Sequence, residues 1–163
     1  MGKTIVGVMG PGEGASEDER RAARELGALI AAEGWVLLTG GRACGVMEAA
    51  SRGAREAGGL TIGVLPTEDA ESASEFVDLA VVTGMGQARN QINVLTSRVV
   101  FACGAGAGTA SEIALALKAR KPVILLRATG EARAFFASLG RGAVRFADGP
   151  REAVEIARAV IGE

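Results

Sequence analysis

The sequence predicts an α/β fold in which helices cover both faces of a doubly wound, mostly parallel sheet. Short runs rich in β-branched residues alternate with longer stretches of helical periodicity, and glycine occurs at nearly every change of element. Hydrophobic residues make up 48% of the chain but aromatic residues only 4%, so Ala, Val, Ile and Leu must build most of the core. That set of residues is typical of buried parallel strands.

About seven strands are expected, each a short apolar run that ends near a turn residue. In chain order they are Thr4–Met9, Trp35–Thr39, Thr61–Leu65, Leu79–Val82, Val99–Cys103, Pro122–Leu126 and Val144–Ala147. Because helical segments separate most of them, the strands predict a Rossmann-like sheet within one ligand-binding domain that spans residues 1–163.

Six helices are expected from the helical periodicity of the longer segments. They are Glu17–Glu33, Val46–Ala57, Gln87–Ser97, Thr109–Ala119, Glu131–Leu139 and Pro150–Ile161. Two of the starts have the pattern of a capping box, Ser16 with Glu19 and Thr109 with Glu112. Pro150 suits the first turn of the last helix.

Charge and composition exclude several classes of function. Lys and Arg number 18 against 19 Asp and Glu, and no segment is basic enough to follow a nucleic-acid backbone. The opening MGKTIVGVMG has too short an apolar run for a signal peptide or a membrane span, so we expect a cytoplasmic protein with no membrane partner. With no histidine, and with Cys44 and Cys103 far apart, we expect neither a bound metal nor histidine-based catalysis.

Four glycine-rich turns are expected at the carboxyl edge of the sheet. They lie at residues 10–14, 40–45, 84–86 and 104–109. At this edge helix N-termini present free N–H groups, and glycine lets a phosphate approach the backbone. Any one of these turns could serve chain reversal alone, but the set of four favours anion binding. We therefore predict a phosphorylated small molecule bound between the 104–109 and 40–45 turns.

Two common nucleotide motifs are absent. Thr109 stands where the dinucleotide pattern GxGxxG needs its last glycine, and the strand that follows ends at Arg127 with no acidic residue, so no NAD site is expected. In the four glycine-rich turns no glycine is followed by Lys and then Ser or Thr, so none of these turns is a P-loop.

Arg42 and Arg89 are the predicted side-chain partners of the phosphate, because arginine can hold an anion with two parallel hydrogen bonds. Either could instead be a solvated surface charge. The functional interpretation is stronger for Arg89, because the rest of its helix has an apolar face. For Glu112 the residues leave two roles open, as the partner of Thr109 in a capping box or as a group that faces the ligand.

Several of these motifs resemble the LOG-like superfamily, formerly called lysine decarboxylase-like. They are the GGRACGVM run at 40–47, Arg89-Asn90 and GAGAGTASE at 104–112. The superfamily signature PGGxGTxxE is matched by Gly106, Gly108, Thr109 and Glu112, whereas Gly104 and Ala105 replace its first two residues. Asn90 replaces the lysine that usually follows the arginine of the family.

A closer and nearly chain-long resemblance is to molybdenum cofactor carrier proteins. It rests on GVMGPGE, EGWVLLTGGR, GVMEAAS, GGLTIGVLP, GMGQARNQINVLTS and CGAGAGTASEIALALK. The resemblance implies a homodimer or homotetramer that holds molybdopterin by its phosphate without converting it, and that has molybdoenzymes as recipients. Apolar residues of the helices at 87–97 and 109–119 also favour a homo-oligomer. The residues expected to bind the cofactor are Gly10, Pro11, Gly12, Gly40, Gly41, Arg42, Arg89, Asn90, Gly104, Gly106, Ala107, Gly108, Thr109 and Glu112.

An enzyme is the alternative. In LOG-type nucleoside 5′-monophosphate phosphoribohydrolases, the residues that match Arg89 and Glu112 promote cleavage of the N-glycosidic bond. Three features disfavour this activity here: Asn90 in place of lysine, Gly104-Ala105 at the start of the signature, and the short chain. The sequence therefore favours a non-catalytic binding protein and leaves the hydrolase as the competing hypothesis.

Overall fold

The computed structural model describes residues 2–104 and 106–162, and Ala105 of the predicted 104–109 turn lies outside this part. One seven-stranded, all-parallel sheet runs through it in the order β4-β3-β2-β1-β5-β6-β7. The predicted doubly wound α/β fold is thus confirmed. The strands are β1 (Ile5–Met9), β2 (Val36–Thr39), β3 (Thr61–Leu65), β4 (Leu79–Val82), β5 (Val100–Cys103), β6 (Val123–Leu126) and β7 (Val144–Ala147).

The helices lie within a few residues of their predicted positions. They are α1 (Glu17–Ala32), α2 (Gly45–Glu56), the 3₁₀ turn η1 (Gly86–Arg89), α3 (Asn90–Thr96), α4 (Ala107–Lys118), α5 (Gly130–Gly140) and α6 (Pro150–Gly162). The capping box at α1 is confirmed, because the Ser16 N–H donates to Glu19 Oε2 at 2.7 Å and the Glu19 N–H donates to Ser16 Oγ at 3.2 Å. The helix predicted over 87–97 instead begins with the tighter turn η1, which puts Arg89 at its junction with α3.

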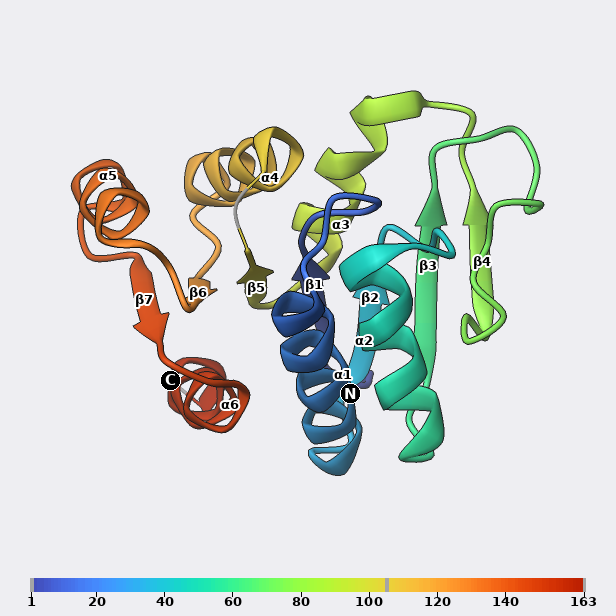
Figure 1. Cartoon of the computed structure of the whole chain (residues 1–163), viewed down its shortest axis with the longest axis horizontal. Coiled ribbons are helices and arrows are strands. Elements are labelled where there is room, and N and C mark those ends of the chain that lie inside the picture. The colour runs from blue at the N-terminus through green and yellow to red at the C-terminus, as the bar shows by residue number, and fades with distance from the viewer. Residues whose placement is uncertain (1, 105, 163) are drawn as a thin grey trace.

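Two layers of helices enclose the sheet (Figure 1). On one face α1, α2 and α6 bury a core that includes Leu26, Ile30 and Val154. On the other face α3, α4 and α5 bury a second core that includes Val94, Ile113 and Phe136. Most strand residues are wholly buried between these layers, which explains their continuous apolar runs.

The winding of the sheet reverses between β1 and β5. The chain proceeds outward from β1 through β2 and β3 to β4, and then returns to place β5 on the other side of β1. The loops after β1 and β5 therefore leave the sheet in opposite directions at its carboxyl edge. In open parallel sheets this reversal point is where ligands bind.

Exposed apolar surface gathers at the β4 edge. Leu79, Val81 and Val82 are 52%, 43% and 43% exposed. Leu95 of α3 is 52% exposed but lies elsewhere, where its carbonyl accepts a hydrogen bond from Lys121. The expected contribution of the 109–119 helix to an oligomer surface is wrong in part, because Ile113 is buried in the core under α4. Among the described helices, none is both long and apolar enough to span a membrane.

Candidate functional site

A cavity of about 180 Å³ lies at the reversal point, between the loops that follow β1, β2 and β5. Most of the residues singled out from the sequence meet here, although they come from four separate segments of the chain. Those that line the cavity are Gly10, Pro11, Gly12, Gly40, Arg42, Arg89, Asn90, Gly106, Gly108, Thr109 and Glu112. The cavity therefore lies where the glycine turns predicted a site; that these residues bind a ligand remains a prediction.

The first two loops are locked to each other by backbone contacts. The Val46 N–H donates to the Pro11 carbonyl at 3.0 Å, so the loop after β1 rests against the start of α2. Gly45 has a φ of +56°, and a Cβ there would collide with the carbonyls of Pro11 and Gly12. Glycine is thus required at Gly45 both by its left-handed backbone and by this close approach.

The third loop leads into a helix start without a side-chain cap. Gly106 is the N-cap of α4, and within the described residues no side-chain hydrogen bond caps this helix start. The predicted capping box of Thr109 with Glu112 is wrong, because α4 begins two residues earlier and places Thr109 inside its first turn. The free N–H groups and the helix dipole make this end of the cavity attractive to an anion.

Gly106 and Gly108 do not need to be glycine for the fold. Neither has a positive φ. Among the described residues, a Cβ on Gly108 would meet no heavy atom within 4 Å, and one on Gly106 would meet only Pro11 Cγ at 3.9 Å. Both residues line the cavity. Their missing side chains therefore keep open the space in front of the α4 N-terminus, where an anion would approach the backbone.

Arg89 is buried inside the protein, with only 7% of its surface exposed. Its Nη1 donates to the Val64 carbonyl at 2.8 Å, whereas its buried Nε has no hydrogen-bond partner among the described residues. Within residues 2–104 and 106–162 no carboxylate lies within 4 Å of this guanidinium. Burial lowers the pKa of Arg89, against the opposing influence of nearby Glu112. A buried arginine without an ion-pair partner is costly unless a bound anion compensates it.

The absence of a side chain at Gly40 makes room for this guanidinium. A Cβ on Gly40 would collide with Arg89 Nη1 and would lie 2.6 Å from Met47 Sδ. The glycine after β2 therefore leaves the space that the Arg89 guanidinium occupies.

Glu112 lies on the same cavity and is 8% exposed. Burial raises the pKa of its carboxyl to about 7, although the positive charge of Arg89 works in the opposite direction. The neighbouring Thr109 Oγ1 is buried and has no hydrogen-bond partner in the part of the chain that the structure describes. Near neutral pH the cavity thus offers unsatisfied donors from Arg89, Thr109 and the helix start, together with one carboxyl that can gain or lose a proton.

The remaining predicted residues differ in their placement. Arg42 lines the cavity, and its half-exposed guanidinium lies 3.6 Å from the Glu13 carboxylate. Gly41, Gly104 and Ala107 do not line the cavity. A Cβ on Gly41 would lie 2.8 Å from Gly63 Cα, and one on Gly104 would collide with the Glu19 carboxylate, so both glycines serve packing.

Met9, Met47 and Gln87 also line the cavity and were missed from the sequence. Met47 and Gln87 each belong to a segment that the motifs highlighted, but nothing in the pattern distinguishes them from neighbouring residues. Within the described residues no group of three His, Cys, Asp or Glu side chains could hold a metal ion. The donors of Arg89, Thr109 and the α4 N-terminus suit the cavity to hydrogen bonding with an anion.

Solved structures closely similar to this chain include proteins that handle the molybdenum cofactor. The molybdenum cofactor binding protein from Rippkaea orientalis superimposes with a TM-score of 0.97 at 55% identity, over 99% of both chains. The molybdenum cofactor carrier protein from Chlamydomonas reinhardtii gives a TM-score of 0.95 at 50% identity, over 99% of this chain and 100% of its own. The family resemblance predicted from the motifs is confirmed.

Two curated relatives extend the comparison. An uncharacterized protein of Archaeoglobus fulgidus is 44% identical over 122 residues, which are 75% of this chain and 79% of the relative. The cytokinin riboside 5′-monophosphate phosphoribohydrolase of Mycobacterium tuberculosis is 37% identical over 93 residues, which are 56% of this chain and 50% of the enzyme. The SLOG cluster4 family model matches residues 3–154. The chain therefore belongs to the SLOG cluster4 family.

Proposed function

We propose that this protein binds and carries the molybdenum cofactor and holds it by its phosphate in the cavity at the β1–β5 reversal point. The proposal is supported by the likeness, over nearly the whole chain, to the cofactor binding and carrier proteins of Rippkaea orientalis and Chlamydomonas reinhardtii. On this view the protein stores and protects its ligand for molybdoenzyme recipients and does not convert it.

The observation that carries the proposal is the burial of Arg89 beside an uncapped helix start. Its guanidinium keeps one unsatisfied N–H and has no carboxylate within 4 Å in the described part of the chain. A phosphate at the α4 N-terminus would accept hydrogen bonds from Arg89, from Thr109 and from backbone N–H groups. Such contacts would supply the partners that these buried donors otherwise lack.

The size of the cavity limits how much of the ligand it can enclose. Sites that surround a whole drug-sized ligand usually have volumes of about 300–1,000 Å³, whereas this cavity has about 180 Å³. It can therefore enclose the phosphate and the atoms next to it. We propose that the pterin lies outside the enclosed part, beside the half-buried Arg42 and the exposed Gln87, which also line the cavity.

Identification of the bound ligand tests the proposal. The protein is produced in a molybdenum-replete host, and the molecule that copurifies is identified by mass spectrometry, for wild type and for Arg89→Met. Arg127→Met is the matched control, because Arg127 is an exposed arginine outside this cavity. We expect a pterin with wild type and the control and none with Arg89→Met. A bound nucleotide without any pterin would contradict the carrier proposal.

A phosphoribohydrolase is the second candidate, and the buried Glu112 favours it. A carboxyl whose pKa lies near 7 beside an arginine could stabilise an oxocarbenium-like transition state or activate water at a ribose. The Mycobacterium tuberculosis enzyme is 37% identical over part of this chain. Release of base from nucleoside monophosphates by wild type, abolished in a folded Glu112→Gln variant, would establish the enzyme and overturn the carrier.

A further inference from the structure

Five cationic side chains gather at the amino edge of the sheet, where α4 and α5 end and β6 and β7 begin. They are Lys118, Arg120, Lys121, Arg141 and Arg145. We call this group the basic junction.

Several contacts bring these segments together. Leu117 Cδ2 lies 3.4 Å from the Cβ position of Gly140, the Val123 N–H donates to the Ala143 carbonyl at 3.3 Å, and Arg145 donates to the Gly142 carbonyl. The basic junction is thus one surface formed by residues from several elements.

This surface contains an excess of positive charge. Residues 113–130 and 132–147 contain no Asp or Glu, and within the described residues none of the five cations forms an ion pair. The nearest acidic residues in sequence, Glu112, Glu131 and Asp148, lie toward the opposite, carboxyl edge. Lys118 and Arg141 also complement the negative ends of helix dipoles, and Lys121 Nζ donates to the Leu95 carbonyl in the last turn of α3 at 3.0 Å. These roles do not account for Arg120 and Arg145.

The backbone gives an independent indication that the fold does not require arginine here. Arg120 has a φ of +57° and Arg141 a φ of +44°, which is left-handed backbone that glycine adopts at lower energy. At these two positions the positive charge is present despite its conformational cost. Binding of another molecule by these positive charges would explain why arginine is present at both positions.

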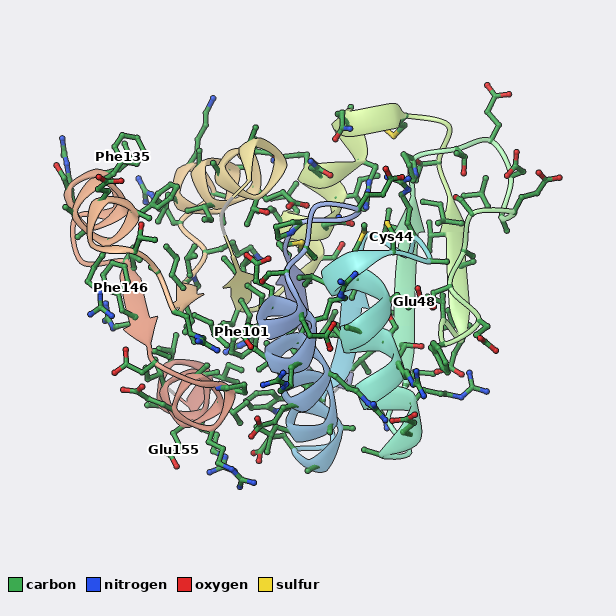
Figure 2. All side chains as sticks on the ribbon, in the orientation of Figure 1. Cys44, Glu48, Phe101, Phe135, Phe146 and Glu155 are labelled. Carbon is green, nitrogen blue, oxygen red and sulfur yellow. The ribbon has the colours of Figure 1, made fainter. Side chains whose placement is uncertain are left out.

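An apolar pair adjoins the basic junction on α5. Phe135 is 62% exposed and Leu139 is 50% exposed, and their spacing of four residues puts them on one side of the helix. Figure 2 shows Phe135 on the outer side of α5, away from the sheet. Leu139 lies two residues before Arg141, so the apolar pair is continuous with the basic junction.

We propose that the basic junction, with Phe135 and Leu139, is a docking surface for an acidic protein partner. An aromatic anchor beside charged groups is typical of protein interfaces, and the positive charge selects a partner rich in carboxylates. The surface lies at the opposite edge of the sheet from the Arg89 cavity, so a docked partner leaves the cavity mouth open. The inference does not depend on which ligand the cavity holds.

The test measures binding of a fluorescein-labelled amphipathic helical peptide that has Glu on one face and Leu on the other. A peptide with Gln in place of Glu, a DNA duplex and phosphatidylglycerol vesicles are the competing probes. The protein variant is the double substitution Arg120→Gly with Arg141→Gly. Arg127→Gly is the matched control, because Arg127 also has a positive φ, of +52°, but lies at the carboxyl end of β6.

We expect the acidic peptide to bind wild type more tightly at low salt, and the double variant to bind it about fivefold more weakly. Phe135→Ser should also weaken binding, whereas Arg127→Gly should not. The melting temperature of the double variant should be unchanged or higher, because glycine relieves the left-handed backbone. Equal binding of the Gln peptide, tighter binding of DNA or vesicles, or an unchanged affinity of the double variant would overturn the proposal.

Discussion

Gly108→Ala separates the requirements of the proposed ligand from those of the fold. The substitution adds one methyl group to the first turn of α4, on the cavity wall. In the free protein this methyl group would meet no heavy atom of residues 2–104 and 106–162 within 4 Å, and the backbone of Gly108 has no positive φ. We therefore expect the variant to fold without strain and to lose affinity for phosphate compounds.

The two effects have opposite signs. Alanine is favoured over glycine inside a helix by up to about 1 kcal/mol, which corresponds to a rise of about 2–4 °C in melting temperature for a chain of this size. A phosphate kept away from the α4 N-terminus would lose a charge-assisted hydrogen bond, worth about 1.5–3 kcal/mol. That loss is roughly a 10- to 150-fold weaker affinity.

Calorimetric titration with inorganic phosphate and adenosine 5′-monophosphate, together with thermal unfolding, measures both effects. Gly130→Ala is the matched control, because Gly130 is also in the first turn of a helix and its Cβ would also meet nothing within 4 Å, but it lies outside the cavity. The control should gain stability and keep its affinity. If Gly108→Ala binds phosphate compounds as tightly as wild type, the anion does not lie at the α4 N-terminus and the reasoning fails.

Three further predictions concern the cavity and the β4 edge. Arg89→Ala should weaken phosphate binding by about 1.5–3 kcal/mol, measured by the same titration with Arg127→Ala as control; a change near zero would remove Arg89 from the site. Because burial raises the pKa of Glu112 to about 7 from an ordinary value of 4.5, the folded protein holds this proton more tightly than the unfolded chain. The free energy of unfolding should therefore fall as the pH rises from about 4.5 to about 7, by up to about 3 kcal/mol. Urea unfolding across this pH range should show the fall in wild type and not in Glu112→Gln. If the free energy of unfolding changes with pH equally in both proteins, the prediction is contradicted. The exposed apolar residues of β4 predict a homo-oligomer, which Val81→Lys should shift toward monomer in light scattering, whereas Thr67→Lys, outside β4, should not; a wild type that is already monomeric would refute the prediction.

Local sequence patterns predicted the elements well, because each pattern reflects interactions within a few residues. The strand at Thr61–Leu65 and the capping box of Ser16 with Glu19 depend on their own segments and were predicted correctly. Thr109 and Glu112 have the same local pattern but form no capping box, since α4 starts at Ala107. The local sequence allows α4 to begin either at Ala107 or at Thr109, and the pattern of Thr109 with Glu112 does not determine which of the two starts the folded chain adopts.

The order of strands and glycine turns in the sequence determined that the loops after β1, β2 and β5 would meet at one edge of the sheet. Parallel strands joined by helices place their carboxyl ends together, so this follows from the periodicity alone. Only the tertiary structure decided that Arg89 is buried against Val64, that Glu112 shares its cavity, and that Gly41 serves packing against Gly63. Burial depends on contacts between segments far apart in the chain, and these contacts cannot be predicted from a residue's neighbours in sequence.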